Sequence, residues 1–364
     1  DLSKMKKAIH NSIALTLVIG VVLTVIGLVF NDPILKAIGV PNDVFSEAST
    51  YLSIYFWSLI FVMIYNMGSG ILRSVGDSKR PLYFLIFSSI INIVLDFLFV
   101  KNFGFGVAGA GYATLIAQAI SAIMVMYVLM KTEDSYKVVL KDIKFDKEIL
   151  LKIIKIGLPT GFQQSIVSLS NVIVQSYINV YGASVIAGYS VTIKIDGFVN
   201  LPLQAFNMAI TTFVGQNIGA KQYNRVKKGA YITTFLAMVT IGFFVVIMYF
   251  FGRDFIALFN QEKDVIDAGR LMQLTFLPFY IFLPINQVIN GVLRGAGRSA
   301  VPMYVMIFSF VFLRQFYLFL VTKVTSDVVY VFLGWPTTWV VCSLIFIVYF
   351  FKVQWLPQEK GAEA

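Results

Sequence analysis

Apolar runs long enough to cross a bilayer constrain this chain more than any other feature. Several runs of 18 or more residues contain no charge or only one, and about 20 apolar residues suffice for a helix to cross the hydrocarbon core. Charged residues make up only 13% of the 364 residues, about half the fraction usual in soluble domains. The sequence therefore predicts an all-α, polytopic membrane protein. We expect ten spans, at residues 11–30, 51–72, 81–100, 107–130, 157–180, 184–213, 229–251, 270–293, 301–321 and 328–351.

The distribution of Lys and Arg predicts the orientation of these spans. If the chain starts in the cytoplasm, the segments on that side hold 21 of the 29 Lys and Arg, and the opposite segments hold six. This asymmetry is the positive-inside bias of membrane proteins. We therefore expect a multi-pass protein of the cell membrane with both ends of this chain cytoplasmic. The net charge of +10 then needs no nucleic-acid partner, because no soluble domain presents a basic face.

One unit is used twice along the chain. The stretch GILRSVGDSKRPLYFLIFS, residues 70–88, recurs at 291–309 with 10 identities in 19 positions, and the same offset of 221 aligns residues 1–30 with 222–251. Six predicted crossings separate each residue from its copy, so both copies have the same orientation, as in transporters built from parallel repeats. On this offset residues 147–221 have no counterpart. A complete twofold unit would therefore contain two more helices, about 75 residues, ahead of the present start.

The repeat predicts a division into an incomplete four-span N-lobe at 1–130 and a six-span C-lobe at 156–352. Residues 131–155 form a basic segment between them, and 353–364 form a cytoplasmic tail. The basic segment could be a signalling or lipid-binding patch, but we favour a cytoplasmic linker that ends in an interfacial helix start.

The best chemical candidate is an acid in the span at 81–100. Asn92 and Asp96 stand one helical turn apart, so their side chains point the same way. An ionisable group at membrane depth is a functional candidate by default, and this carboxylate could take a proton or, with the amide oxygen, coordinate a hard cation. The second copy has Leu313 and Tyr317 at these positions, so such chemistry would be asymmetric. The alternative is a structural Asp paired with an amide.

Two polar stripes mark neighbouring spans in the second half. Residues Gln164, Ser168, Asn171, Gln175 and Asn179 follow one another at helical spacing, and the next span repeats the pattern with Asp196, Asn200, Gln204 and Asn207. We interpret the stripes as the walls of a shared wet cavity, although such amides could also only join helices. Lys194 and Asp196 are two positions apart and do not face each other, so each needs another partner or water.

The remaining motifs do not indicate an enzyme. Residues 104–109, GFGVAG, match a dinucleotide-binding string, but no strand precedes them and Leu129 stands where an acid is needed. These glycines and Gly111 fit close helix packing better. The single His10 and single Cys342 exclude a histidine metal cluster, a catalytic triad and an internal disulfide. We expect His10 to be an interfacial residue and Cys342 to be a packing residue.

The chain resembles the multidrug and toxic compound extrusion (MATE) family over nearly its whole length. The motifs that carry the resemblance are GLPTG at 157–161, FVGQNIGAKQYNRVKKGA at 213–230, GVAGAGYATLIAQ at 106–118, LRSVGDSKRP at 72–81 and LRGAGRSAVP at 293–302. The resemblance implies a twelve-helix transporter with two six-helix lobes around a central cavity, which exports organic cations and other xenobiotics against H⁺ or Na⁺. The present chain would hold helices three to twelve.

The resemblance also implies site residues. The N-lobe cation site of the family corresponds here to Asn92, Asp96 and Thr114, which would be the metal ligands if the ion is Na⁺. Members with a C-lobe site carry acids on helices seven and ten, where this chain has only uncharged polar residues, so the N-lobe site is favoured. The predicted substrate cavity, in which tyrosines would hold an organic cation by cation–π attraction, comprises Tyr65, Asn66, Gln164, Ser168, Asn171, Gln175, Tyr189, Asp196, Asn200, Tyr280, Gln287 and Asn290.

Three functional hypotheses remain open on the sequence. The favoured one is a monomeric antiporter in the lipid bilayer that exports small organic cations or drugs by alternating access, needs no cofactor besides its coupling ion, and is not an enzyme. The second is a flippase for lipid-linked saccharides of the same superfamily. We rank it lower because only Lys194 and Arg314 are intramembrane cations. The third is a truncated form that transports nothing.

Overall fold

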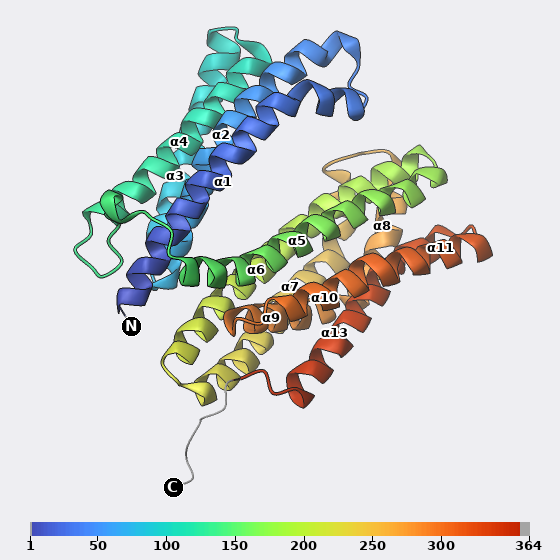
Figure 1. Cartoon of the computed structure of the whole chain (residues 1–364). Helices are drawn as coiled ribbons and strands as arrows, with labels where there is room; N and C mark the ends of the chain where they lie inside the picture. The colour runs from blue at the N-terminus through green and yellow to red at the C-terminus, as the bar shows by residue number, and fades with distance from the viewer. Residues whose placement is uncertain (1, 357–364) are drawn as a thin grey trace. The chain divides into compact units, whose positions relative to one another are not determined.

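The computed structural model describes residues 2–356, and every regular element among them is a helix (Figure 1). Contacts divide the chain into two compact units, Asp1–Ile154 and Lys155–Ala364. The predicted linker at 131–155 falls almost wholly within the first unit. Most of the predicted tail at 353–364 lies outside the described residues.

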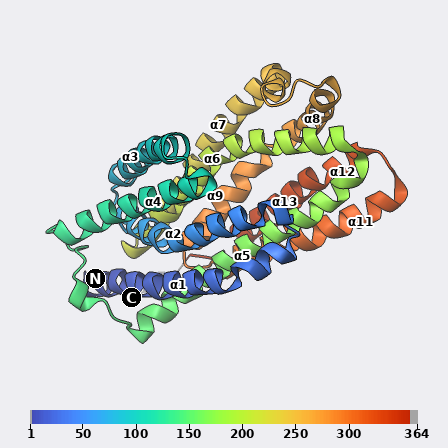
Figure 2. The same cartoon turned by 90° about the horizontal axis from the view of Figure 1, so that it is seen from above.

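Unit 1 is a bundle of four long helices, in which α2 packs against α1 and α4, and α4 also packs against α3 (Figure 2). Its core contains Leu72, Val125 and Leu129, all fully buried. Glycine allows the close approach of α2 and α4, because a Cβ on Gly68 would lie 2.8 Å from Val125. The elements are α1 (Leu2–Ala37), α2 (Asn42–Ser74), α3 (Lys79–Asp96), the π-helical η1 (Phe97–Asn102), α4 (Gly106–Lys131) and the short 3₁₀ helix η2 (Leu140–Asp142).

The segment after α4 is tied to the start of α1. His10 Nε2 accepts a hydrogen bond from the Val139 amide at 3.0 Å, and Asn11 Oδ1 accepts one from the Asp146 amide at 2.9 Å. Lys7 Nζ lies 2.9 Å from the Asp146 carboxylate, and its hydrogen bond lowers the pKa of that carboxyl group. His10 is a buried anchor of this contact, with only 5% of its surface exposed.

Unit 2 is built around α6, which packs against α7, α8 and α9, while α13 packs against α9 and α11. Helix α5 joins this bundle through side chains, since Ser170 Oγ donates to the Phe310 carbonyl at 2.7 Å. The elements are α5 (Lys147–Ile178), η3 (Asn179–Tyr181), α6 (Ala183–Gly219), α7 (Tyr223–Ala257), α8 (Lys263–Phe276), η4 (Leu277–Phe279), α9 (Phe282–Gly295), α10 (Ala300–Ile307), the π-helical η5 (Phe308–Leu313), α11 (Arg314–Val324), α12 (Val328–Phe332) and α13 (Gly334–Lys352).

Small residues bring α6 into close contact with α8 and α9. A Cβ on Gly188 would lie 2.7 Å from the backbone nitrogen of Gly269, and one on Gly291 would lie 2.7 Å from the Asn207 carbonyl. Because the helices are so close, two hydroxyls of α6 reach backbone carbonyls of α8 and α9. Thr192 Oγ1 and Thr211 Oγ1 each lie 3.1 Å from a glycine carbonyl, of Gly269 and Gly291 respectively. Small residues and such hydrogen bonds are the usual means of helix association in lipid.

The helix boundaries follow the offset of 221 residues. Helix α1 begins at Leu2 and α7 at Tyr223, while α3 begins at Lys79 and α10 at Ala300. The continuous α2, Asn42–Ser74, corresponds to residues 263–295, where the second unit has α8, η4 and α9 with a bend of 59°. Pro278 lies in η4, directly before the break at residues 280–281, and a proline interrupts the helical hydrogen-bond ladder. Its counterpart in α2 is Trp57, so that helix continues without interruption.

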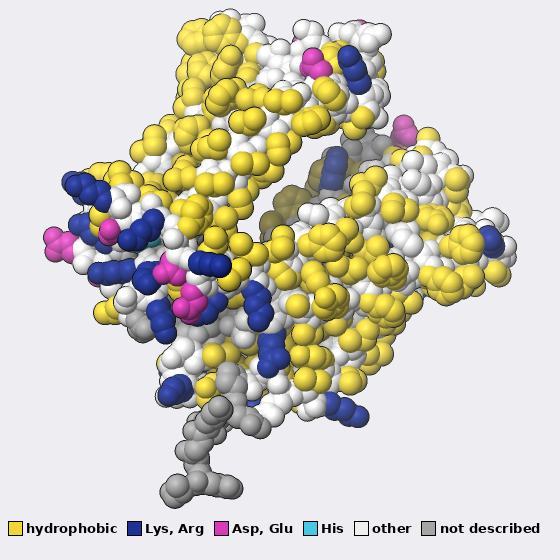
Figure 3. Space-filling model, in the orientation of Figure 1, with side chains coloured by type: hydrophobic (Ala, Val, Ile, Leu, Met, Phe, Trp, Pro, Cys, Tyr) yellow, Lys and Arg dark blue, Asp and Glu magenta, His cyan; other side chains and the backbone are white. Residues whose placement is uncertain are grey.

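Helices occupy all ten predicted spans, which confirms the fold class. Among residues 2–356, seven helices are long and apolar enough to cross a membrane, or up to eight if the bent pair counts as one. Helices α5 and α6 are not among them, because of the polar stripes seen in the sequence. Figure 3 shows hydrophobic side chains over the flanks of unit 1, and Lys and Arg gathered at the end where the N-terminus lies. This is the surface of a multi-pass membrane protein.

Candidate functional site

The candidate acid of unit 1, Asp96 on α3, faces the interior of its bundle. Asn92 and Asp96 are half-buried on α3, whereas Ile93, Val94 and Phe97 between and beside them are exposed. The two polar side chains therefore share the inner face, as their spacing predicts. Asn92 Nδ2 and Asp96 Oδ1 are both buried and have no hydrogen-bond partner among the described residues. A buried polar atom without a partner is costly, so this site is chemically incomplete.

Local helix geometry distinguishes this position. The π-helical turn η1 begins directly after Asp96, at Phe97, and η1 and α3 both pack against α4, the helix that carries a half-buried Thr114. A carboxylate and an amide on one face, with a hydroxyl on the helix packed against it, are groups that suit a proton or a hard cation. No cluster of three or more His, Cys, Asp or Glu that could hold a metal is present within residues 2–356.

The two predicted cavity residues of unit 1 have different environments. The Tyr65 side chain is buried, and its hydroxyl donates to the Pro81 carbonyl at 2.8 Å, which fastens α2 to the start of α3. Asn66 is exposed. Tyr65 is therefore engaged in packing within unit 1.

Unit 2 contains a polar pocket of about 350 Å³ between α5, α6, α9 and α10. Five residues predicted to line a cavity are found here, namely Gln164, Gln204, Asn207, Gln287 and Asn290. Six of the nine lining side chains are amides, one is a guanidinium, and none is an acid. The lining residues are Gln163, Gln164, Gln204, Asn207, Met208, Gln287, Asn290, Arg294 and Met306.

Sequence reasoning missed Gln163, Met208, Arg294 and Met306 in this pocket. The stripe that we selected on α5 is its exposed face, on which Gln164 and Ser168 lie. Gln163 and Ser170 are the buried pair. They are seven residues apart, so they share one face of α5, which differs from the face of the predicted stripe. The spacing of Gln163 and Ser170 is visible in the sequence. We did not select this pair because the neighbouring stripe contains more amide side chains.

The rest of the α5 stripe does not line this pocket. Asn171 Oδ1 accepts a hydrogen bond from Arg314 Nη1 at 3.0 Å, and Gln175 Nε2 donates to Asn179 Oδ1 at 2.9 Å. Arg314 is only 2% exposed, donates from Nη2 to Thr338 Oγ1 at 3.1 Å, and lies over the ring of Trp335. A buried guanidinium is thus held by neutral hydrogen-bond acceptors and aromatic faces.

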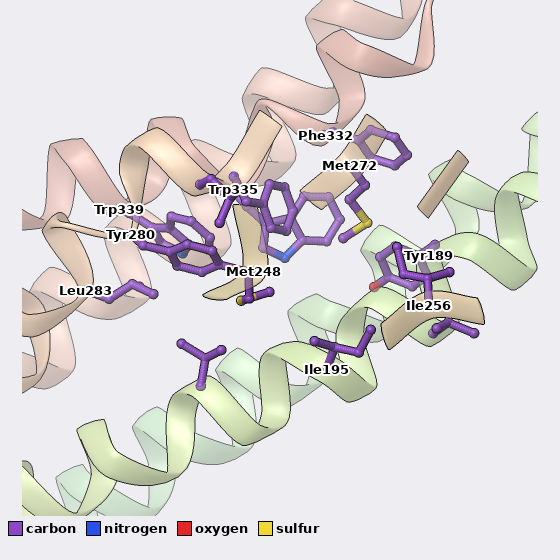
Figure 4. Packing of buried hydrophobic residues seen from close by; sticks show 14 of the residues in the cluster. Tyr189, Ile195, Met248, Ile256, Met272, Tyr280, Leu283, Phe332, Trp335 and Trp339 are labelled. Atoms are coloured by element: carbon purple, nitrogen blue, oxygen red, sulfur yellow. The ribbon is translucent and has the colours of Figure 1, made fainter. Parts of the chain in front are cut away.

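Three further predicted cavity residues, Tyr189, Asp196 and Tyr280, are buried in the packed core of unit 2, and Asn200 lies beside Asp196. The Tyr280 hydroxyl donates to the carboxylate of Asp196, and the Tyr280 ring stacks on Trp339 with centroids 5.6 Å apart (Figure 4). Tyr189 lies against Trp335, and the Asn200 side chain donates to the Asp196 carbonyl at 2.9 Å. The structure places Tyr280 and Tyr189 among core side chains because aromatic partners cover their rings. Lys194 is exposed and does not meet Asp196, as the spacing predicts.

Fold and apolar surface together define a polytopic helical membrane protein. The family model MatE matches residues 1–98 and 159–319. Over 365 aligned residues the chain is 30% identical to the "Probable multidrug resistance protein YoeA" of Bacillus subtilis, with 98% of this chain and 78% of that protein covered. It is 27% identical over 308 residues to the "Probable multidrug resistance protein NorM" of Thermotoga maritima, covering 82% and 65%. The chain belongs to the MatE family.

Solved structures share the fold. A MOP superfamily transporter from Pyrococcus furiosus, whose title reads "Reverse polarity of binding pocket suggests different function", superposes with a TM-score of 0.90 at 22% identity, covering 96% of this chain and 78% of that one. A multidrug resistance MATE family transporter described in an outward-facing conformation gives 0.85 at 22% identity, covering 96% and 83%. At this identity the likeness concerns the fold alone.

Proposed function

We propose that this protein exports organic cations and other drug-like molecules across the cell membrane, in exchange for H⁺ or Na⁺, by alternating between states open to opposite sides. Family membership supports the transport class, and the names of the related proteins support multidrug export. The observation that carries the coupling part is the incomplete polar site on the inner face of α3. There, Asp96 Oδ1 and Asn92 Nδ2 are buried and have no hydrogen-bond partner within residues 2–356.

The physical argument starts from the cost of that arrangement. A buried carboxylate oxygen without a partner is unfavourable by about 1–3 kcal/mol or more. A proton or a cation at Asp96 would remove this cost, with Asn92 and Thr114 as the neighbouring polar groups. Binding of the ion would then favour whichever conformation buries the site, and substrate would favour the other. Ion and substrate are coupled because each binds one of the two conformations more tightly than the other. This coupling needs no cofactor besides the ion.

The orientation is part of the proposal. Lys and Arg are concentrated in the segments that we assign to the cytoplasm, and the segment after α4 that packs on α1 is one of them. This bias supports a cytoplasmic location for both the start of the chain and the segment 131–155. We further propose that a single copy acts with its surrounding lipid.

Dye efflux from proteoliposomes under separately imposed proton and sodium gradients tests the proposal. We expect ethidium efflux to follow one of the two gradients, and Asp96→Asn to remove gradient-driven efflux. Asp43→Asn, which changes an exposed carboxylate in the first turn of α2, is the control and should transport like the parent protein. Equal gradient-driven efflux by Asp96→Asn and the parent would refute coupling at this residue.

A further inference from the structure

We infer that the polar pocket of unit 2 binds an oxyanion group, a carboxylate or a phosphate, of a small ligand. The inference rests on the proposed function and deepens it, because it names a chemical group of the cargo. It extends the cargo beyond simple cations to molecules that also carry a negative charge. A volume of about 350 Å³ falls within the range of small-molecule sites.

Two buried amides point their donors at the same weak acceptor. Gln163 Nε2 lies 2.7 Å from Met306 Sδ, and Asn290 Nδ2 lies 3.2 Å from the same sulfur. Gln163 is 1% exposed and Asn290 is 3% exposed, so water satisfies neither well. A thioether sulfur is a poor hydrogen-bond acceptor on a flexible side chain. An oxygen placed where Met306 Sδ now lies would be a much better partner for both donors.

A guanidinium completes the set of donors. Arg294 lines the same pocket, and its Nη2 makes only a long contact, 3.4 Å, with Asn290 Oδ1. The planar guanidinium offers several N–H groups in a fork that matches carboxylate and phosphate oxygens. No lining residue is an acid, so an anionic group would meet no like charge in the pocket. The chemistry of this wall therefore selects a negative group over a positive one.

Helix association alone does not account for the arrangement. Asn207 Nδ2 donates to the Gln287 carbonyl at 2.7 Å, which is a direct bond between α6 and α9 and fits a purely structural role. Among the described residues, the amide nitrogens of Gln163 and Asn290 donate to no backbone carbonyl and meet only Met306 Sδ. The amide nitrogens of both residues thus have only a thioether sulfur as their partner among the described residues, and a ligand oxygen would be a better one.

The repeat supplies a matched control. Arg73 occupies the position equivalent to Arg294, in the motif LRSVGDSKRP, and both side chains are half-buried. The positions equivalent to Asn290 and Met306 are Ser69 and Leu85, so unit 1 lacks the converging amides and their sulfur. Removal of the charge at Arg73 should therefore leave oxyanion binding unchanged.

The test is carried out on the purified full chain with methyl-¹³C methionine, using benzoate and phenyl phosphate as probes and benzamide as the uncharged analogue of benzoate. The Met306 methyl resonance, assigned from Met306→Leu, reports the pocket directly. We expect both anions to shift this resonance saturably. Benzamide should need a roughly tenfold higher concentration for the same shift, because it cannot make the charge-assisted hydrogen bonds of a carboxylate. Arg294→Gln should weaken benzoate binding by roughly tenfold or more, and Arg73→Gln should leave it unchanged.

Several outcomes would overturn the inference: no shift of Met306 by either anion, equal binding of benzoate and benzamide, or equal losses in the two arginine variants. If Arg294→Gln fails to fold, Arg294→Lys is used instead, because it keeps the positive charge but loses the paired N–H groups of the guanidinium. We expect this variant to bind benzoate more weakly than the parent protein does, but still more tightly than it binds benzamide. Ethidium efflux is measured in parallel. If the protein exports ethidium but the pocket binds neither anion, this inference is wrong and the proposed function stands. If the pocket binds the anions but no gradient drives ethidium efflux, the proposed function is wrong and this inference stands.

Discussion

Tyr280 donates its hydroxyl hydrogen to the carboxylate of Asp196 inside the core of unit 2. Tyr280 stands in the break between η4 and α9, and Asp196 lies in the middle of α6, with 7% of its surface exposed. The bend of 59° at this break separates the two halves of the span and carries the tyrosine between them. The interruption that Pro278 introduces therefore has a structural use, since it places a hydroxyl opposite the buried acid.

Removal of that hydroxyl should destabilise the protein. Tyr280→Phe leaves the Asp196 carboxylate buried without its donor, and we expect a loss of about 1–3 kcal/mol in the free energy of unfolding. Tyr189→Phe is the control, because Tyr189 is similarly buried against Trp335 but is not the donor to Asp196. Thermal unfolding of the purified variants measures both effects. Equal melting temperatures for the two variants would contradict the assigned role of the hydrogen bond.

Asn171 should contribute to stability through Arg314. Asn171→Ala removes the acceptor of Arg314 Nη1 and leaves a fully buried guanidinium with an unpaired donor. Bonds to charged groups contribute about 1.5–3 kcal/mol, so the melting temperature should fall. Ser168→Ala changes the neighbouring turn of the same exposed face of α5 and should have little effect. A fall of the same size in Ser168→Ala would show that the α5 surface, and not the contact with Arg314, is responsible.

The contact between α6 and α8 should not tolerate a side chain. In Gly188→Ala the new Cβ would lie 2.7 Å from the backbone nitrogen of Gly269, so the helices must separate, at a cost of about 1–3 kcal/mol. Gly197→Ala lies on the same helix with nothing within 4 Å of the new methyl group. It should be neutral or stabilise the helix by up to about 1 kcal/mol. Urea or thermal unfolding that ranks the two variants in the opposite order would contradict this packing.

Attachment of the segment after α4 should depend on pH through Asp146. Its pKa is lowered below the ordinary value of 3.8 by the hydrogen bond from Lys7. The ionised form is thus favoured in the folded state, so the contact stabilises at neutral pH and is lost as the pH falls through the lowered pKa. Hydrogen exchange of residues 132–146 should show this acid-dependent loss of protection in the parent protein.

Two variants separate this ion pair from general acid effects. Asp146→Asn should exchange faster at neutral pH and lose the acid dependence. Asp142→Asn changes an exposed carboxylate in the same segment and should behave like the parent. Acid dependence that persists unchanged in Asp146→Asn would assign the effect to another group.

The candidate sites were predicted unevenly. Asn92 and Asp96 share an inner helix face, as a spacing of four residues requires, because direction within one helix is a local property. The pocket of unit 2 was predicted only in part. Gln164, Gln287 and Asn290 line it, but Tyr280 and Asp196 form a buried pair with each other. Which face of a polar helix meets a cavity depends on its neighbours, and the stripe itself does not contain that information.

The amino-acid sequence alone determined the helical membrane class, the positions of the helices and the repeat register, because in lipid each backbone must satisfy its hydrogen bonds within its own segment. Helix starts 221 residues apart, such as Leu2 and Tyr223, reflect that local rule. Only the tertiary structure decided the pairs that give the interior its chemistry. Tyr280 meets Asp196 across 84 residues, and Gln163 meets Met306 across 143. Such partners depend on how each helix is rotated against the next, and that rotation is set by packing of glycines and large side chains from distant parts of the chain.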